Sequence, residues 1–411
     1  CRALNTPISL DDIRWLVGPE GAGLLAELGR SAGSLAAIAE RLKRRFSPER
    51  VHLALEQIEL RRRAARKFPD APRMFFLPET IQQATDRWIA GYKAGRFPAG
   101  EPLADLCCGI GGDLLGLAAR GPVTAVDASA AALAVAEANL RSLLPPGQGV
   151  PPCEFRAEDA GRFRVDRFAA WHLDPDRRAG GRRTTRLDGC QPGPATIDRL
   201  LLECPNGAIK LAPASETPQG WQREAELEWI SRDRECRQQV AWFGALAGNP
   251  GLRRATILRS RSDGSAIVGT VVGQAHRRLP TADRLGRYVF DPDSAVIAAG
   301  LTGHLARRHA LAAIHPAASY LTGDDLLDDG CLQCFEVSDA LPFDRKRLRA
   351  LVRQRGIGRL EIKVRGVDGN PERIRRELRL QGSGEAVLLL ARAGRRAVAI
   401  LARRIRPHGA A

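Results

Sequence analysis

The stretch ADLCCGIGGDLLGLA, residues 104–118, decides the fold of this chain. Its first apolar run ends in a glycine-rich turn, and a second apolar run follows directly. Nucleotides bind where a strand turns into a helix through glycines in several classes of α/β protein. The residues around the glycines, and those that end the following strands, determine which nucleotide binds.

Short apolar runs that end in acids, glycine or proline recur along the middle of the chain. They are PLADLCCGI (102–110), PVTAVDA (122–128), CEFRAEDA (153–160), FAAWHLDPD (168–176) and GAIKLAP (207–213). Helical stretches separate them, notably residues 128–144, and this alternation predicts a parallel α/β sheet with right-handed connections. Residues 255–272 predict two antiparallel strands around the turn Asp263-Gly264. The predicted fold is a Rossmann-like sheet, parallel with an antiparallel hairpin at one edge.

The two ends of the chain differ from this middle part. Residues 34–46, 48–68 and 77–97 carry apolar residues at helical spacing, with Pro78 and Glu79 in the first turn of the third helix. Near the other end, strands at 359–366 and 385–404 flank a basic helix at 371–380. We expect four parts: a helical domain (1–97), the α/β domain (98–275), a connecting segment (276–334) and a small basic α+β domain (335–411).

The glycine turn does not suit a phosphate-bearing nucleotide. A dinucleotide fingerprint, G-x-G-x-x-G, would need a third glycine where Leu114 stands. Asp113 would lie at the helix N-terminus, where it would repel a pyrophosphate. The G-K-[ST] of a phosphate-binding P-loop is absent from the sequence.

S-adenosylmethionine (SAM) has different requirements, because it carries an ammonium, a sulfonium and a ribose but no phosphate. Asp105 can hold the ammonium, directly or through water, and Asp127 can accept hydrogen bonds from the ribose hydroxyls. Asp159 is placed to accept a hydrogen bond from the adenine amine, although it can also be a turn residue without a ligand. The predicted cofactor-binding residues are Asp105, Cys108, Gly109, Gly111, Asp113, Asp127 and Asp159.

The residues DLCCGIGGD, 105–113, resemble motif I of class I SAM-dependent methyltransferases. They are especially similar to the D-x-x-C-G-x-G-G-[DN] variant of RNA-modifying members such as the trimethylguanosine synthases. Most of the chain resembles bacterial class I methyltransferases with a THUMP-like C-terminal domain. The matching pieces are RRRAARKFP (61–69), QQATDRWIAGYKAGRF (82–97), HLDPDRR (172–178), EWIS (228–231) and residues 335–378. The resemblance implies methyl transfer from SAM, and the THUMP-like module implies RNA as the substrate, ribosomal or transfer RNA.

The residues closest to the transferred methyl group should follow the fourth strand. Asp174-Pro175 takes the place of the [DN]-P-P-[FYW] motif of enzymes that methylate exocyclic base amines. Asp176 and Arg177 replace the second proline and the aromatic residue, so an aromatic that could stack on a base is missing there. The predicted catalytic residues are Asp174, Pro175, Arg177 and Arg178.

This departure favours a guanine ring nitrogen over an exocyclic amine, because a ring nitrogen with a free lone pair needs no general base. Asp174 could accept a hydrogen bond from a base edge, and Arg177 or Arg178 could hold a phosphate or a guanine edge. An aspartate that caps a helix, next to a surface arginine pair, is the other interpretation. His172 alternates with core positions and is expected to be structural.

The charge of the chain predicts an anionic partner. The formal net charge is +16 and the isoelectric point is about 10.2, which favours phosphate backbones as partners. An arginine-rich composition with solvated basic faces is the alternative, and it applies equally to the basic run 61–67. The predicted RNA contacts are Lys363, Arg365, Arg373, Arg375, Arg376 and Arg379, which would position RNA without reading its sequence.

Other classes of protein are not expected. No run of about 18 apolar residues is present, so we expect no membrane contact. The first 30 residues lack the apolar core of a signal peptide. The nine cysteines include one C-x-x-C, Cys331 and Cys334, without a second pair or a histidine set, so we expect reduced thiols, no metal and a cytoplasmic location.

Two alternatives to an RNA methyltransferase remain open. The first is a methyltransferase of a small molecule or a protein, whose basic tail serves oligomerisation or an acidic partner. The second is an RNA-binding protein with a degenerate catalytic pocket, against which the intact motif I argues. The sequence does not specify an oligomeric state.

Overall fold

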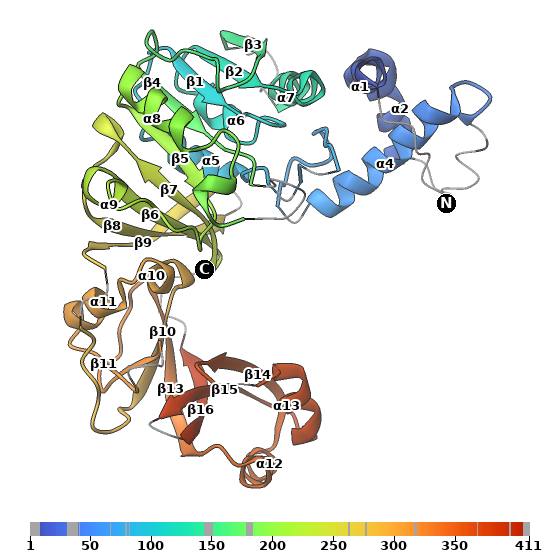
Figure 1. Ribbon diagram of the computed structural model, residues 1–411. Helices are drawn as coiled ribbons and strands as arrows, with labels where there is room; N and C mark the ends of the chain where they lie inside the picture. Colours follow the sequence, from blue (N-terminus) through green and yellow to red (C-terminus); the bar gives the residue numbers. More distant parts are fainter. Residues whose placement is uncertain are drawn as a thin grey trace. The chain divides into compact units, whose positions relative to one another are not determined.

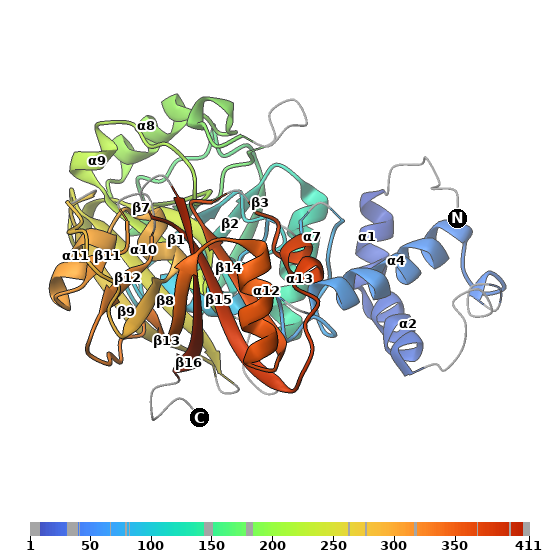
Figure 2. The same cartoon turned by 90° about the horizontal axis from the view of Figure 1, so that it is seen from below.

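The computed structural model describes most of the chain (Figures 1 and 2). The described residues are 9–30, 40, 42–65, 67–78, 80–81, 83–143, 151–177, 184–261, 264–275, 278–315, 319–367, 369–393 and 396–405. They form two compact units. The first contains residues up to Leu211 with 215–217 and 241–248, and the second contains the remainder. The four-part division expected from the sequence stays a prediction.

A nine-stranded sheet has the order β3-β2-β1-β4-β5-β7-β6-β8-β9. Its first five strands are β1 (Leu103–Leu106), β2 (Val123–Asp127), β3 (Cys153–Ala157), β4 (Ala170–Leu173) and β5 (Gly207–Leu211). They pair in parallel, and every residue of β1, β4 and β5 is buried, as in a sheet covered on both faces. The helices of this part are α6 (Leu114–Leu117), α7 (Ala130–Leu143) and α8 (Pro194–Glu203), with a 3₁₀ turn η2 (Leu187–Gly189). The Rossmann-like parallel sheet is confirmed.

The other edge of this sheet carries the predicted hairpin. Strands β8 (Arg253–Arg261) and β9 (Gly264–Gly273) pair antiparallel, and β9 ends the sheet. Asp263 of the predicted turn lies outside the described residues. The sequence did not predict the preceding strands β6 (Glu226–Arg232) and β7 (Glu235–Trp242), which Asp233 and Arg234 join with positive φ angles. Short elements α9 (Trp221–Glu224) and η3 (Gly244–Leu246) flank them.

The N-terminal part is helical, as predicted, but two of its helices are shorter than expected: the one predicted over 48–68 ends at Ala64, and the one predicted over 77–97 ends at Ala94. Its helices are α1 (Leu10–Val17), α2 (Pro19–Arg30), α4 (Pro48–Ala64) and α5 (Arg87–Ala94). The helix predicted over 77–97 begins only at Arg87, because the Asp86 carboxylate caps it by accepting hydrogen bonds from the amides of Trp88 and Ile89. Most of the helix expected at 34–46 lies outside the described residues.

The second unit contains a seven-stranded sheet of order β11-β12-β10-β13-β16-β15-β14. Its strands are β10 (Tyr288–Pro292), β11 (Ala312–Ala313), β12 (Leu321–Gly323), β13 (Leu332–Pro342), β14 (Ile357–Arg365), β15 (Gly384–Ala393) and β16 (Arg396–Ile405). The predicted strands and basic helix near the C-terminus are confirmed as β14, β15, β16 and α13 (Pro371–Leu378). Figure 2 shows α13 beside α12 (Arg345–Gln354), and both pack their apolar residues on this sheet. Helices α10 (Ser294–Ala298) and α11 (Thr302–Arg308) follow β10.

Two features are absent from the part of the chain that the structure describes. None of their helices has the length and apolar character needed to cross a bilayer. They also contain no group of three or more histidines, cysteines or acids that could hold a metal ion.

A buried asparagine on α7 joins the N-terminal part to the glycine turn. The Oδ1 of Asn139 accepts the amide of Phe75 at 2.7 Å, and its Nδ2 donates to the carbonyls of Phe75 (3.0 Å) and Ile110 (2.9 Å). Asn139 is fully buried. One side chain therefore satisfies three backbone groups from two segments that lie far apart in the sequence.

We predict that Asn139→Leu lowers the free energy of unfolding by about 3 kcal/mol, because each of three buried backbone groups loses its partner at about 1 kcal/mol or more. Urea denaturation followed by tryptophan fluorescence measures the change. The matched control is Glu137→Gln on the same helix, where a solvent-exposed ion pair with Arg141 contributes little. Equal stability of the two variants would contradict the prediction.

Candidate active site

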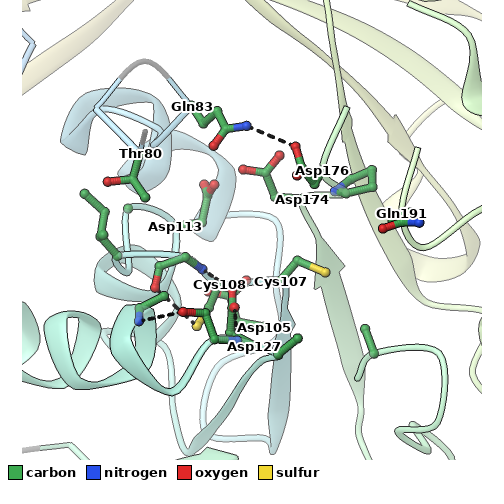
Figure 3. A pocket seen from close by; sticks show the side chains of 18 of the residues that line it. Thr80, Gln83, Asp105, Cys107, Cys108, Asp113, Asp127, Asp174, Asp176 and Gln191 are labelled. Atoms are coloured by element: carbon green, nitrogen blue, oxygen red, sulfur yellow. Dashed lines mark hydrogen bonds between the residues drawn. The ribbon is translucent and has the colours of Figure 1, made fainter. Parts of the chain in front are cut away.

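A cavity of about 650 Å³ opens at the carboxyl ends of the parallel strands (Figure 3). This is the edge at which α/β sheets bind their ligands. Residues from six places in the chain line it: the segment before α5 (Leu77, Thr80 and 83–85), the glycine turn (105–113), residues 127–132, the loops after β3 and β4, and residues 191–196. In Figure 3, Asp105, Cys108 and Asp127 lie at one end, and Asp174, Asp176 and Gln83 lie at the other.

The glycine turn after β1 is built for close approach of two segments. Gly111 has a φ of 85°, and a Cβ there would lie 3.3 Å from the Cβ of Ala136 on α7. A Cβ on Gly112 would lie 2.7 Å from the carbonyl oxygen of Thr85. The turn thus packs against α7 on one side and against the segment before α5 on the other, so larger residues at these positions would open the cavity wall.

Asp127, at the end of β2, is held in one orientation by backbone amides. Its Oδ2 accepts from Gly109 at 2.9 Å and its Oδ1 accepts from Ser129 at 2.8 Å. Burial raises the pKa of this carboxyl. The remaining lone pairs can accept hydrogen bonds from a pair of adjacent hydroxyls, such as those of a ribose.

Asp105 provides the clearest test of whether SAM fits this cavity. It is fully buried, and its Oδ1 lies 2.8 Å from Nδ1 of His172. Asp105 lines the cavity, and its buried Oδ2 has no hydrogen-bond partner among the described residues. An ionised oxygen left in this way requires a donor or a cation, and the ammonium of SAM supplies both. The SAM site predicted from the sequence therefore fits these residues.

The other predicted cofactor residues have different surroundings. Asp159 is exposed at the cavity and accepts the amide of Gly161 at 2.8 Å. Cys108 is buried beside the turn, and burial raises the pKa of its thiol well above the usual range. Direct contacts of these residues with the cofactor stay predictions.

Asp113 faces the cavity, but protein groups already engage its carboxylate. The ammonium of Lys93 lies 2.7 Å from Oδ1, and the hydroxyl of Thr85 donates to Oδ2 at 2.6 Å. Although burial alone would raise its pKa, the nearby lysines, Lys93 first and then Lys210, bring the pKa well below the usual range. A contact between Asp113 and the cofactor stays a prediction.

At the other end of the cavity, Asp174 forms an ion pair that the sequence did not reveal. The Nζ of Lys210 on β5 lies 2.5 Å from its Oδ2 and also donates to the carbonyl of Gln83 at 2.7 Å. The side-chain amide of Gln83 donates to Oδ1 of Asp176 at 3.2 Å. The backbone of Asp176 pairs with Gln191 in both directions, at 2.8 and 2.9 Å. These contacts fix the two carboxylates beside the cavity.

The structure separates the other predicted catalytic residues. Pro175 lines the cavity together with Asp174. Arg177 is half-buried and is not among the residues that line the cavity, while Arg178 lies outside the described residues. Catalytic roles for all four stay predictions.

Four residues with polar contacts at this site were missed by the sequence reasoning: Gln83, Thr85, Lys93 and Lys210. For the two lysines a signal was present. Lys93 lies on the same face of α5 as buried Ile89 and Ala90, and Lys210 interrupts an apolar strand. A lysine on a buried face requires an acidic or polar partner.

The six predicted RNA contacts divide into paired and unpaired cations. Lys363 and Arg365 approach the buried carboxylate of Asp291, at 2.9 and 3.3 Å, which Arg234 also approaches. Ion pairs with exposed or half-buried glutamates engage Arg373 and Arg375. Arg376 and Arg379 are exposed and have no acidic partner among the described residues.

We predict that the affinity for SAM falls several-fold between pH 7.5 and about pH 5. Burial raises the pKa of Asp105 and Asp127, so these carboxyls take up protons at a higher pH than an exposed aspartate does, and a protonated Asp105 no longer attracts an ammonium. Isothermal titration calorimetry at both pH values measures the change. In the Asp105→Asn protein the dependence should be smaller; an affinity that is constant in the wild type would argue against this account.

Comparison with known proteins agrees with this geometry. A family model described as THUMP domain-like matches residues 332–404, and a domain of unknown function (DUF8688) matches residues 9–64. An uncharacterised SAM-dependent methyltransferase of Mycobacterium tuberculosis, from strains CDC 1551 and H37Rv, is 34% identical over 364 residues. The match covers 86% of this chain and 96% of the relative.

The same architecture occurs in a solved structure. The crystal structure of a candidate methyltransferase from Porphyromonas gingivalis W83 matches with a TM-score of 0.75 at 18% identity, covering 97% of this chain and 98% of that one. This likeness concerns the fold, whereas the mycobacterial relative is close enough in sequence to define the family. The chain belongs to the SAM-dependent methyltransferases, among those with a THUMP-like C-terminal domain.

Proposed function

We propose that this methyltransferase modifies a nucleobase of structured RNA, ribosomal or transfer RNA. The observation that carries the proposal is the THUMP-like domain at 332–404, in which two neighbouring helices carry unpaired cations. The formal net charge of +16 attracts polyanions to the chain. Such a substrate, and the free cysteines among the described residues, are consistent with the cytoplasm as the compartment.

The unpaired cations define the surface that we propose for RNA. On α12 the exposed side chains of Lys346, Arg347 and Arg353 have no acidic partner among the described residues, and Arg376 and Arg379 at α13 are similar. We call these five residues the α12–α13 cations. The two helices are neighbours, since Arg349 of α12 donates to the carbonyl of Glu377 on α13. Aromatic side chains are scarce here, which favours contacts with the phosphate backbone over stacking on bases.

A ring nitrogen of guanine is the acceptor that we favour. No Phe, Tyr or Trp is among the described residues that line the cavity, so a stacked exocyclic amine has little support. Lys210 holds one oxygen of Asp174, which leaves the other to accept a hydrogen bond, and Asp176 provides a second carboxylate. Guanine offers adjacent N–H donors on its Watson–Crick edge, to which carboxylates are complementary.

The chemistry requires little beyond orientation. Bound SAM would supply a methyl group on a positively charged sulfur. The lone pair of the base nitrogen forms the new C–N bond while the C–S bond breaks, and S-adenosylhomocysteine leaves. The protein holds the two reactants in line and at contact distance, which is the main source of acceleration in such a displacement.

We predict that purified protein transfers tritium from labelled SAM to total bacterial RNA, and that prior RNase treatment removes the signal. Asp105→Ala should lose both SAM binding and label. Asp174→Ala should keep SAM binding but lose most of the label, because its contact is with the acceptor. If SAM binds and RNA stays unlabelled, the enzyme methylates a small molecule or a protein instead; if RNA binds without SAM, the pocket is degenerate.

We predict that Arg376→Gln weakens RNA binding and reduces the slope of log K against log salt by about 0.7–0.9, which corresponds to the loss of one phosphate contact. Filter binding at several salt concentrations measures both. Arg359→Gln is the matched control, because this exposed arginine of the same domain already pairs with Glu385. Equal effects of the two substitutions would argue for general charge rather than the α12–α13 cations.

A further inference from the structure

Four buried ionisable side chains form a continuous polar network at the SAM cavity, and three of them, Asp105, Asp113 and His172, line it. They come from β1, β4, α5 and the glycine turn, and their order is Asp105, His172, Lys93 and Asp113. His172 Nδ1 lies 2.8 Å from Asp105, His172 Nε2 lies 3.1 Å from the Nζ of Lys93, and Lys93 lies 2.7 Å from Asp113. None of these four side chains is more than 8% exposed.

The contacts of Lys93 determine which nitrogen of His172 carries the proton. An ammonium has hydrogens to donate and no lone pair, so next to Lys93 the Nε2 of His172 must act as acceptor. A neutral imidazole then carries its proton on Nδ1, which faces Asp105. Burial lowers the pKa of Lys93, and the carboxylate of Asp113, 2.7 Å away, opposes this shift and favours the ammonium.

The strand pairing places His172 permanently beside Asp105. The two residues are direct partners in the parallel register of β1 and β4. The imidazole therefore occupies Oδ1 of Asp105, a residue that lines the cavity, while Oδ2 has no hydrogen-bond partner among the described residues. A carboxylate with one oxygen fixed and one free presents a single direction to an incoming cation.

We infer that His172 is a positioning residue for the amino-acid end of SAM: its Nδ1–H, with the tautomer set by Lys93, turns the free oxygen of Asp105 toward the ammonium. This inference concerns the cofactor and does not depend on RNA as the substrate. If His172 had a merely structural role, its substitution would lower the affinity for every ligand of the cavity equally. If His172 is a positioning residue, its substitution lowers the affinity only for ligands that carry the ammonium.

Two ligands separate these roles, because S-adenosylhomocysteine carries the amino-acid end and 5′-methylthioadenosine lacks it. We expect His172→Leu to lower the affinity for S-adenosylhomocysteine about 10- to 100-fold, which is the range for the loss of a hydrogen bond to a charged group. The affinity for 5′-methylthioadenosine should change less than about twofold. His172→Asn should restore most of the lost affinity, because its side-chain amide can donate from the position of Nδ1. Isothermal titration calorimetry measures all the affinities.

The inference would be overturned if His172→Leu lowered the affinity for both ligands equally. It would also be overturned if His172→Asn bound S-adenosylhomocysteine no more tightly than His172→Leu does. If the leucine variant does not fold, nuclear magnetic resonance of the wild type decides, with ¹⁵N-labelled histidine and the asparagine variant used for assignment. We expect a neutral His172 with its proton on Nδ1. A proton on Nε2, or a doubly protonated ring, would be incompatible with the proposed contacts between Asp105, His172 and Lys93.

Discussion

The ion pair between Lys93 and Asp113 connects the N-terminal part of the chain to the methyltransferase sheet. It is 2.7 Å long and almost fully buried. Removing either partner would leave an uncompensated charge in the interior, which is among the costliest defects in a protein. Because Lys93 also contacts His172 and Asp113 also accepts from Thr85, the pair orders both the strand end and the segment that closes the cavity.

The fold could be predicted from the sequence because its signals are local. Each parallel strand is an apolar run bounded by turn residues, and the acids at 105 and 127 mark strand ends at the cavity. Strands β6 and β7 were missed because acidic and basic residues occur along them; Glu226 and Glu228 are buried and bond to neighbouring side chains. Local patterns do not reveal such pairing across strands.

The candidate site could be predicted only in part, because its charges act through partners that are distant in sequence. Lys210 approaches Asp174 from a different strand, and Asp291 approaches Lys363 and Arg365 from β10. A count of basic residues in the sequence treats every lysine and arginine as equally available to a phosphate. The structure distinguishes cations that neutralise buried acids from those that are free to meet a ligand.

The part of the cavity wall formed by Leu77, Thr80 and residues 83–85 has a consequence for how this enzyme can be divided. The carbonyl of Gln83 accepts from Lys210, and Thr85 lies against Gly112 and bonds to Asp113. The strands that begin at Leu103 thus supply only part of the binding site. A fragment that starts at the first strand would keep motif I, but the side of the glycine turn that Thr85 covers would be exposed to water. The smallest functional methyltransferase unit therefore extends upstream into the helical region.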